Sequence, residues 1–227
     1  MVTVISLGGS IVAPESVDEI FLKNFYLLIK EFLEKDEKQR FILVTGGGGP
    51  ARTWVKAYKN ISEKTYNDEA DWIGIMATRL NAQLVKAVMG DYCVQDVVTD
   101  PVKVEPLIGR VLVAAGWKPG FSSDYDAVLL AERFRADSVI NLSNIEQVYT
   151  DDPKKNPQAK PIDTISWPDF CSLTGDEWVP GKNTPFDPVA SRYAAKIGLK
   201  VIFAGGRDLA NLRKILSGEN FLGTVIS

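Results

Sequence analysis

The stretch FILVTGGGGPARTWV, Phe41–Val55, holds the pattern that decides the fold. An apolar, β-branched run leads into four consecutive glycines, a proline and an amphipathic segment. Continuous apolar runs are typical of strands that are buried on both faces of a parallel sheet, and proline suits the first turn of a helix. Backbone N–H groups in a glycine turn can approach an anion at the start of the following helix. The stretch therefore predicts a strand–loop–helix unit of the phosphate-binding kind.

The same alternation of strand and helix extends along the chain. Strand-like runs lie at Val2–Leu7, Phe41–Thr45, Val94–Val98, Val111–Ala115, Ser138–Leu142 and Lys200–Ala204. Helical patterns follow a capping box at Ser16–Glu19 as far as Lys35, and lie at about 51–60, 68–89, 123–134, 187–198 and 209–216. This order predicts an α/β fold, a three-layer α/β/α sandwich with a mainly parallel central sheet. No repeat or linker is evident, so we expect a single domain over residues 1–227.

Composition narrows the function classes. The formal net charge of −3 provides no basic field for nucleic acid, and no apolar run is long enough to span a membrane. We expect a cytoplasmic protein in which Cys93 and Cys171 are free thiols. The chain contains no histidine, which excludes Ser-His-Asp triads, Cys-His nucleophiles and histidine metal sites.

A second glycine turn, Gly8-Gly9-Ser10, follows the first predicted strand. Carboxyl ends of parallel strands meet at one sheet edge, so this turn and Gly46–Gly49 should face each other. Arg52 lies one turn into the following helix, within reach of a phosphate at its start. Neither turn is a Walker A or G-x-G-x-x-G motif. Tight turns that only need positive φ are the alternative, but two such loops favour a site for two phosphate-bearing ligands.

Three polar stretches follow later strands and helices. They are GWKPGFSSDYDAV (116–128), NLSNIEQVYTDDP (141–153) and GKNTPFDP (181–188). The first offers hydroxyls and a carboxylate before a helix, the second an aromatic ring and two acids, and the third a lysine and an aspartate. Each has a purely structural alternative, since serine and aspartate also cap helices and form Asx-rich loops.

Taken together, GGS, GGGGPAR, DWIGIMATRLNA, PGFSSD, SNIEQVYTDDP, FDPVASRYAAK and the terminal GTVI resemble the amino acid kinase superfamily. The chain looks most like the archaeal-type uridylate (UMP) kinases, and the resemblance covers essentially its whole length. It implies an acceptor-nucleotide half at about 1–135 and an ATP-binding half at about 136–227.

The resemblance also implies roles for individual residues. It places the UMP site at Gly47, Gly48, Arg52, Asp71, Ser122 and Ser123. It places the ATP site at Gly8, Gly9, Ser10, Asn144, Tyr149 and Asp152. Asp124 and Asp187 match active-site aspartates near the phosphates. Mg²⁺ would arrive with ATP, and no residue is assigned as its ligand.

The chain departs from the family pattern at several positions. Ser6 stands where many members have lysine, and Gly49 where archaeal-type enzymes usually have lysine. Glu146 and Gln147 replace the aspartate and glycine of NVDGVY, and the threonine pair is Ser122-Ser123. Lys182, close to Asp187 in sequence, is our candidate for supplying the lost positive charge as a catalytic residue.

The resemblance implies phosphoryl transfer from ATP to UMP, with oligomers that are often hexamers built from dimers. Two alternatives remain open at this point. One is another small-molecule kinase, acting on an acyl phosphate, isopentenyl phosphate or fosfomycin. The other is a non-catalytic nucleotide- or oxyanion-binding protein similar to molybdenum storage proteins. The apolar positions Phe21, Phe25, Leu28 and Phe32 fit either a core or a subunit interface.

Overall fold

The computed structural model describes residues 2–153, 155–175 and 185–227. In these residues a seven-stranded sheet has the order β3-β2-β1-β4-β8-β9-β7, and β5 pairs with β6 in a separate hairpin. The strands are β1 (Val2–Leu7), β2 (Arg40–Thr45), β3 (Val111–Ala114), β4 (Ser138–Ser143), β5 (Val148–Tyr149), β6 (Pro161–Ile162), β7 (Thr164–Ile165), β8 (Lys200–Gly205) and β9 (Thr224–Ile226). All sheet neighbours are parallel except β8 and β9.

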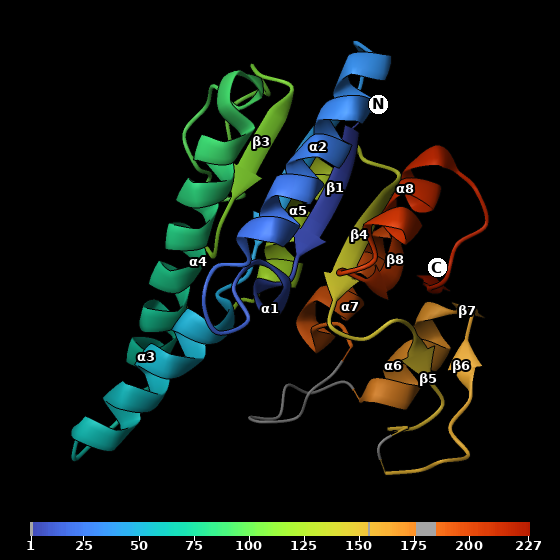
Figure 1. Ribbon diagram of the computed structural model, residues 1–227. Coiled ribbons are helices and arrows are strands. Elements are labelled where there is room, and N and C mark those ends of the chain that lie inside the picture. The colour runs from blue at the N-terminus through green and yellow to red at the C-terminus, as the bar shows by residue number, and fades with distance from the viewer. Residues whose placement is uncertain (1, 154, 176–184) are drawn as a thin grey trace.

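Helices cover both faces of the sheet, as Figure 1 shows with α2 in front of the strands and α5 behind them. The helices are α1 (Gly9–Val12), α2 (Glu19–Lys35), α3 (Gly48–Ile61), α4 (Asn67–Met89), the 3₁₀ turn η1 (Gly90–Tyr92), α5 (Ser123–Arg133), α6 (Trp167–Thr174), α7 (Pro188–Ile197) and α8 (Leu209–Ser217). One apolar core joins α2, α4 and α8 to the sheet, and a second joins α5, α6 and α7 to it. The predicted three-layer α/β/α sandwich is confirmed.

The late helices begin and end where their caps predict. The Asp187 carboxylate accepts a hydrogen bond from the Ala190 N–H at 2.8 Å, and Pro188 opens α7. Gly198 and Gly218 end α7 and α8 with φ of 65° and 70°, a conformation that glycine adopts without strain. These stops confirm the sequence prediction for both helices.

Two local predictions are wrong. The helix α2 begins at Glu19 rather than within a Ser16 capping box, because Asp18 is the N-cap and accepts from the Phe21 N–H at 2.9 Å. The segment 94–98 is not a strand, and only Val98 forms a bridge, to Ala114. Val94 has 59% of its surface exposed, so the segment lacks the burial that would hold it in the sheet.

The apolar face of α2 belongs to the core. Phe21, Phe25 and Leu28 are buried, and Phe32 packs partly buried against the same cluster. Of the two interpretations that the sequence left open for these positions, the core is therefore the correct one.

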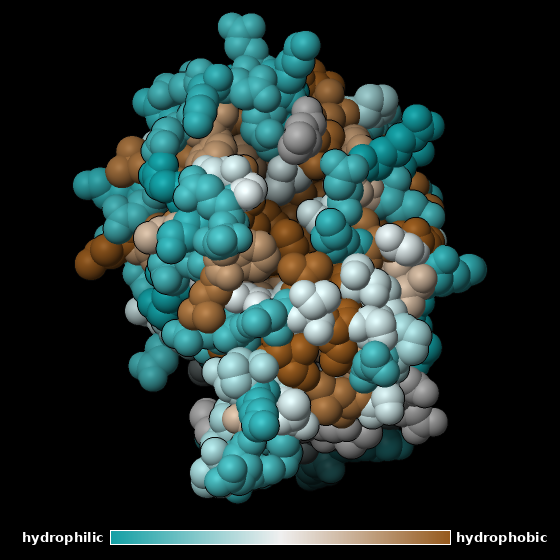
Figure 2. All heavy atoms as spheres, turned by 90° about the vertical axis from the view of Figure 1, so that its right-hand side faces the viewer, coloured by the Kyte–Doolittle hydropathy of each residue, from teal (hydrophilic) through white to brown (hydrophobic). Residues whose placement is uncertain are grey.

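The sheet ends in a very short edge strand. β7 has two residues and pairs with β9, so the edge offers few unpaired backbone groups to another chain. On this side of the molecule, the right-hand side of Figure 1, hydrophobic residues reach the surface between hydrophilic ones (Figure 2). Within the described residues no helix combines the length and apolar character needed to cross a membrane.

Candidate active site

The two glycine loops touch through their backbones at the carboxyl ends of β1 and β2. A Cβ atom on Gly9 would lie 2.1 Å from the Gly48 nitrogen, and one on Gly46 would lie 2.5 Å from the Gly9 nitrogen. No side chain fits at such distances, so close approach requires glycine here. Gly48 also has a φ of 65°. The facing loops expected from the sequence are therefore present, and they are in contact.

Several backbone N–H groups at this crossing are not used by the protein's own hydrogen bonds. Within the described parts of the chain, the N–H groups of Gly9, Ser10, Gly47 and Gly48 have no hydrogen-bond acceptor. Those of Gly47 and Gly48 stand at the N-terminus of α3, where the helix dipole favours an anion. The Gly8 N–H donates instead to Leu142 O at 3.0 Å. The crossing thus combines the donors and the dipole that bind phosphate.

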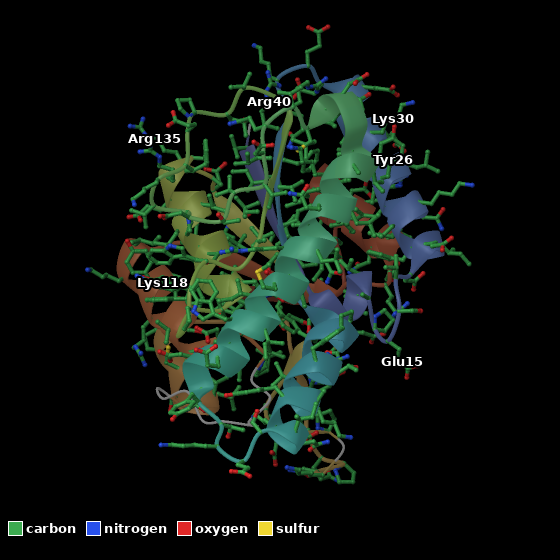
Figure 3. The ribbon with its side chains drawn as sticks, turned by 90° about the vertical axis from the view of Figure 1, so that its left-hand side faces the viewer. Glu15, Tyr26, Lys30, Arg40, Lys118 and Arg135 are labelled. Carbon is green, nitrogen blue, oxygen red and sulfur yellow. The ribbon has the colours of Figure 1, made fainter. Side chains whose placement is uncertain are left out.

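The loop before α2 packs closely against Gly49, one of the departures from the expected family pattern. A Cβ atom on Gly49 would lie 2.2 Å from Pro14 O and 2.8 Å from the Cα of Glu15, the residue labelled on this loop in Figure 3. The Gly49 N–H donates to Ala13 O at 2.8 Å. Glycine at position 49 is therefore matched to the path of residues 13–15.

Arg52 joins the same contact. Its guanidinium donates to the Ser10 hydroxyl at 3.1 Å and to Pro14 O at 2.9 Å. In this structure the side chain therefore ties the first loop to α3. It does not line the cavity described below, although the sequence places it at the acceptor phosphate.

Asp124 lies in the first turn of α5, against the middle of the sheet. Its Oδ1 accepts hydrogen bonds from the Ser6 hydroxyl at 3.0 Å and from the Asn141 amide at 2.9 Å. Ser6 and Asn141 face each other in the register of β1 and β4 and are buried. The Asp187 N–H approaches Oδ2 at 3.4 Å. Four segments of the chain therefore meet at one carboxylate.

These surroundings set the charge of Asp124. Withdrawal from water raises the pKa of Asp124 to about 6, the Ser6 hydrogen bond opposes this rise, and the negative charge of Asp187 adds to it. At neutral pH the group is a carboxylate held next to a second carboxylate. A pair of this kind attracts a cation or orients a lysine at the strand ends.

Asp126 is a second buried acid on α5. Its Oδ2 accepts from the Trp117 N–H at 3.2 Å, whereas its Oδ1 has no partner among the described residues. Burial, with a smaller contribution from the charges of Asp124 and Asp100, raises the pKa of Asp126 to about 7 against the opposing Trp117 hydrogen bond. The sequence analysis did not name this residue as a site residue.

A cavity of about 690 Å³ opens beside the crossing, between α3, α4 and the loop before α5. This volume suits a nucleotide-sized ligand. The predicted site residues that line it are Gly47, Asp71, Ser122, Ser123 and Asp187. The remainder of the lining is largely apolar and comes from α3 and α4, including Ala51, Val55 and Ile75.

The serines and Asp71 also have structural partners. The Ser122 hydroxyl, rather than that of Ser123, caps α5 by accepting from the Tyr125 N–H at 3.2 Å. Asp71 accepts from the Gly120 N–H at 2.9 Å, which joins α4 to the loop before α5. Ser122 and Asp71 therefore line the cavity and at the same time make hydrogen bonds that hold the protein's own structure.

An aromatic wall continues from the cavity. The rings of Trp117 and Phe121 have centroids 5.1 Å apart, and Phe121 lies 4.9 Å from Tyr125. The Lys118 ammonium sits 3.9 Å from the Trp117 ring centroid. Figure 3 shows this side of the molecule, with α4 and α3 in the foreground and Lys118 beyond α4. Phe121 lines the cavity, so the wall offers a flat apolar surface to a ligand.

Helix α4 supports the second glycine loop and the loop before α5. The sequence analysis gave no separate role to the residues that do so. The Asn81 amide donates to Gly46 O at 2.8 Å and to Gly47 O at 3.3 Å. The Thr78 hydroxyl accepts from the Gly116 N–H at 2.8 Å, and Arg79 donates to Trp117 O at 3.0 Å. All three residues lie within the DWIGIMATRLNA motif. Their spacing along a helix is the sequence signal that could have identified them as supporting residues.

The predicted ATP residues beyond β4 lie outside this cavity. Asn144 is exposed and accepts from the Ser143 hydroxyl at 3.3 Å, whereas Tyr149 lies in the β5–β6 hairpin. Asp152 begins the turn that follows and lies 3.9 Å from Lys155. Lys182 lies outside the described residues.

Gln147, one of the departures from the expected family pattern, fits into the protein interior. Gln147 is buried, and its amide donates to Asp163 Oδ1 at 3.0 Å and to Gly223 O at 3.1 Å. Its φ is not positive, since among described residues other than glycine only Arg135 has a positive φ. The backbone at this position therefore does not require glycine.

The described residues contain no cluster of three or more Cys, Asp or Glu side chains that could hold a metal ion. The acids at the strand ends, Asp124 and Asp187, are already engaged by hydrogen bonds from the protein. This donor set fits an ion that arrives on a phosphate ligand rather than one with a cage of its own.

Backbone amides, a helix N-terminus and carboxylates that meet at the ends of parallel strands define a protein that handles phosphorylated ligands. The chain belongs to the amino acid kinase family, whose profile matches residues 1–205.

Relatives and solved structures agree with this assignment. A uridylate kinase of Methanospirillum hungatei is 33% identical over 99% of this chain and 94% of its own length. A uridylate kinase of Pyrococcus abyssi is 32% identical over 96% of both chains. The crystal structure of uridylate kinase from Archaeoglobus fulgidus superimposes with a TM-score of 0.85 at 30% identity and covers both chains completely.

Proposed function

We propose that this protein is a UMP kinase, which transfers the γ-phosphoryl group of ATP to UMP and releases UDP and ADP in pyrimidine nucleotide biosynthesis. The observation that carries the proposal is the cavity of about 690 Å³. Gly47, which precedes α3, lines it together with Asp71 and Phe121. The uridylate kinase relatives of similar length support the same acceptor.

The reaction needs alignment more than a covalent catalyst. A phosphate oxygen of UMP attacks the γ-phosphorus of ATP, and the bond to the β,γ-bridging oxygen breaks as ADP leaves. The acceptor oxygen is already ionised at neutral pH, so no histidine base is needed. The two glycine loops, in contact at Gly9 and Gly48, hold donor and acceptor phosphates close together.

The acceptor side is assigned to about 1–135 and the ATP side to about 136–227, so the site lies where the halves meet at β1 and β4. Asp124 and Asp187 keep the site negative next to the phosphates and attract the cation that accompanies ATP. Mg²⁺ is that cation, and it neutralises phosphate charge when it is bound. For Arg52 to reach the acceptor phosphate, its hydrogen bonds to Ser10 and Pro14 would have to break first.

Oligomerisation is part of the proposal, as a hexamer built from dimers. Large apolar side chains on α3 and α4 face solvent, with Trp54 and Leu80 each 68% exposed and Met76 58% exposed. Exposed large apolar side chains of this kind are suited to a subunit contact. Light scattering coupled to size-exclusion chromatography measures the mass: six chains support the assembly, and a monomer contradicts it.

The activity is tested by ADP release from purified protein with ATP and Mg²⁺. UMP, CMP, dUMP, isopentenyl phosphate and a blank without acceptor are compared side by side. Turnover that depends on UMP supports the proposal. Turnover with isopentenyl phosphate alone assigns another small-molecule kinase, and nucleotide binding without any turnover assigns a non-catalytic binding protein.

A further inference from the structure

Gly74 has no structural reason to be glycine. It lies inside the 23-residue helix α4, where glycine is less stable than alanine. Its φ is not positive, and a Cβ atom built on it would meet no atom of the described residues within 4 Å. Neither backbone conformation nor packing therefore excludes a side chain at this position.

Gly74 faces the cavity between two parts of the acceptor site. It lines the cavity on the same face of α4 as Asp71, one turn earlier, and Thr78, one turn later. The carbonyl oxygen of Gly74 lies 3.2 Å from the place where a Cβ atom on Gly47 would stand. The surface of α4 at Gly74, which carries no side chain, therefore lies between the glycine loop at Gly47 and the carboxylate of Asp71.

We propose that Gly74 is a specificity-determining residue, because the pentose of the acceptor nucleotide lies against the uncovered backbone of α4 at this position. The open space around Gly74 matches a ligand segment that links a phosphate at Gly47 to hydroxyls near Asp71. The described residues leave room for a methyl group here, so we attribute the lack of a side chain to the ligand. This inference rests on the proposed function of a nucleotide acceptor in the cavity.

The test replaces Gly74 with alanine. Gly74→Ala should raise the KM for UMP about tenfold or more, since an added methyl group competes for ligand space. The KM for ATP should change less than about twofold, because the donor lies at the other loop. The melting temperature should rise, since alanine favours the helix. A purely structural role for Gly74 predicts the opposite change in melting temperature.

Two further variants keep the result interpretable. Gln83→Ala, on the exposed face of α4 and outside the cavity, should leave both KM values unchanged. Gly74→Leu fills more of the cavity and should abolish UMP turnover in a protein that still melts cooperatively and still binds ATP.

The outcomes separate this inference from the proposed function. If the wild type turns over UMP and Gly74→Ala has the same KM for UMP, the inference is wrong and the proposed function stands. Equal rises in the KM for UMP and for ATP also overturn the inference. If the wild type neither turns over nor binds UMP in calorimetry, the proposed function fails, and the inference fails with it.

Discussion

The hydroxyl of Ser6 donates a hydrogen bond of 3.0 Å to Oδ1 of Asp124, across 118 positions of the sequence. Ser6 is one of the positions at which the chain departs from the expected family pattern, and here it provides a neutral donor to this carboxylate. The Asn141 amide donates to the same oxygen at 2.9 Å. Two neutral donors therefore keep Asp124 ionised in a place that is largely withdrawn from water.

Ser6→Ala should shift the acidic limb of the activity profile to higher pH. The Ser6 hydrogen bond lowers the pKa of Asp124, which burial has raised to about 6, so its removal raises that pKa further. We expect kcat/KM at pH 6 to fall about three- to tenfold, with little change at pH 8. Ser16→Ala, at an exposed position, is the control, and superimposable profiles of Ser6→Ala and wild type would sink the prediction.

Asp126→Asn should become more stable relative to wild type as the pH rises. Burial raises the folded-state pKa of Asp126 to about 7, above its ordinary value of 3.8. The folded wild type therefore binds the extra proton between these values, and this group's contribution to stability declines as pH rises from about 4 to about 7. Asparagine does not titrate.

Urea unfolding at pH 5 and pH 8 measures this difference. The gain of Asp126→Asn over wild type should be larger at pH 8, by roughly 1 to 3 kcal/mol. Asp137→Asn, at an exposed position, should show no such dependence. A constant difference between Asp126→Asn and wild type at the two pH values would contradict the assignment.

Gly49→Lys restores the residue usual in archaeal-type enzymes and should destabilise this chain. Its Cβ atom would lie 2.2 Å from Pro14 O, so residues 13–15 must move. We expect a loss of about 2 kcal/mol or more in the free energy of unfolding. Gly49→Ala should lose a similar amount because the Cβ atom, not the charge, causes the clash. A melting temperature equal to wild type in both variants would show that the loop yields freely.

Gln147→Ala should weaken the attachment of the β5–β6 hairpin to the end of the sheet. It removes the amide that donates to Asp163 and Gly223, and leaves the buried carbonyl of Gly223 without this donor. We expect a loss of about 1 to 3 kcal/mol in unfolding free energy. Gln158→Ala, at an exposed position, is the matched control, and equal stability of the two variants would refute this role.

The sequence predicted the layers, the parallel strands and the facing glycine loops, because these depend on local apolar runs and on the rule that strand ends share an edge. It missed the two-residue strands β5, β6 and β7, which are too short to show a period. It also misplaced the start of α2, since Ser16 and Asp18 both suit an N-cap and only tertiary contacts choose between them. Asp18 is additionally held by Arg207 at 2.8 Å.

In the candidate site too, local motifs located some residues, whereas contacts between separate segments could not be predicted. Residues fixed by local motifs, such as Asp187 at the start of α7, lie as expected. The partners of Arg52 and the fit of Gly49 against Pro14 depend on how a distant loop crosses α3, which no local pattern records.

The crossing of the two glycine loops also limits how this chain can evolve. Gly9, Gly48 and Gly49 each lack room for a single additional carbon, and the atoms that exclude it belong to the other loop or to residues 13–15. A mutation in one segment is therefore acceptable only if the other segment has already changed. Laboratory libraries that randomise either segment alone should return almost only the starting residues, whereas paired randomisation could recover a lysine at position 49.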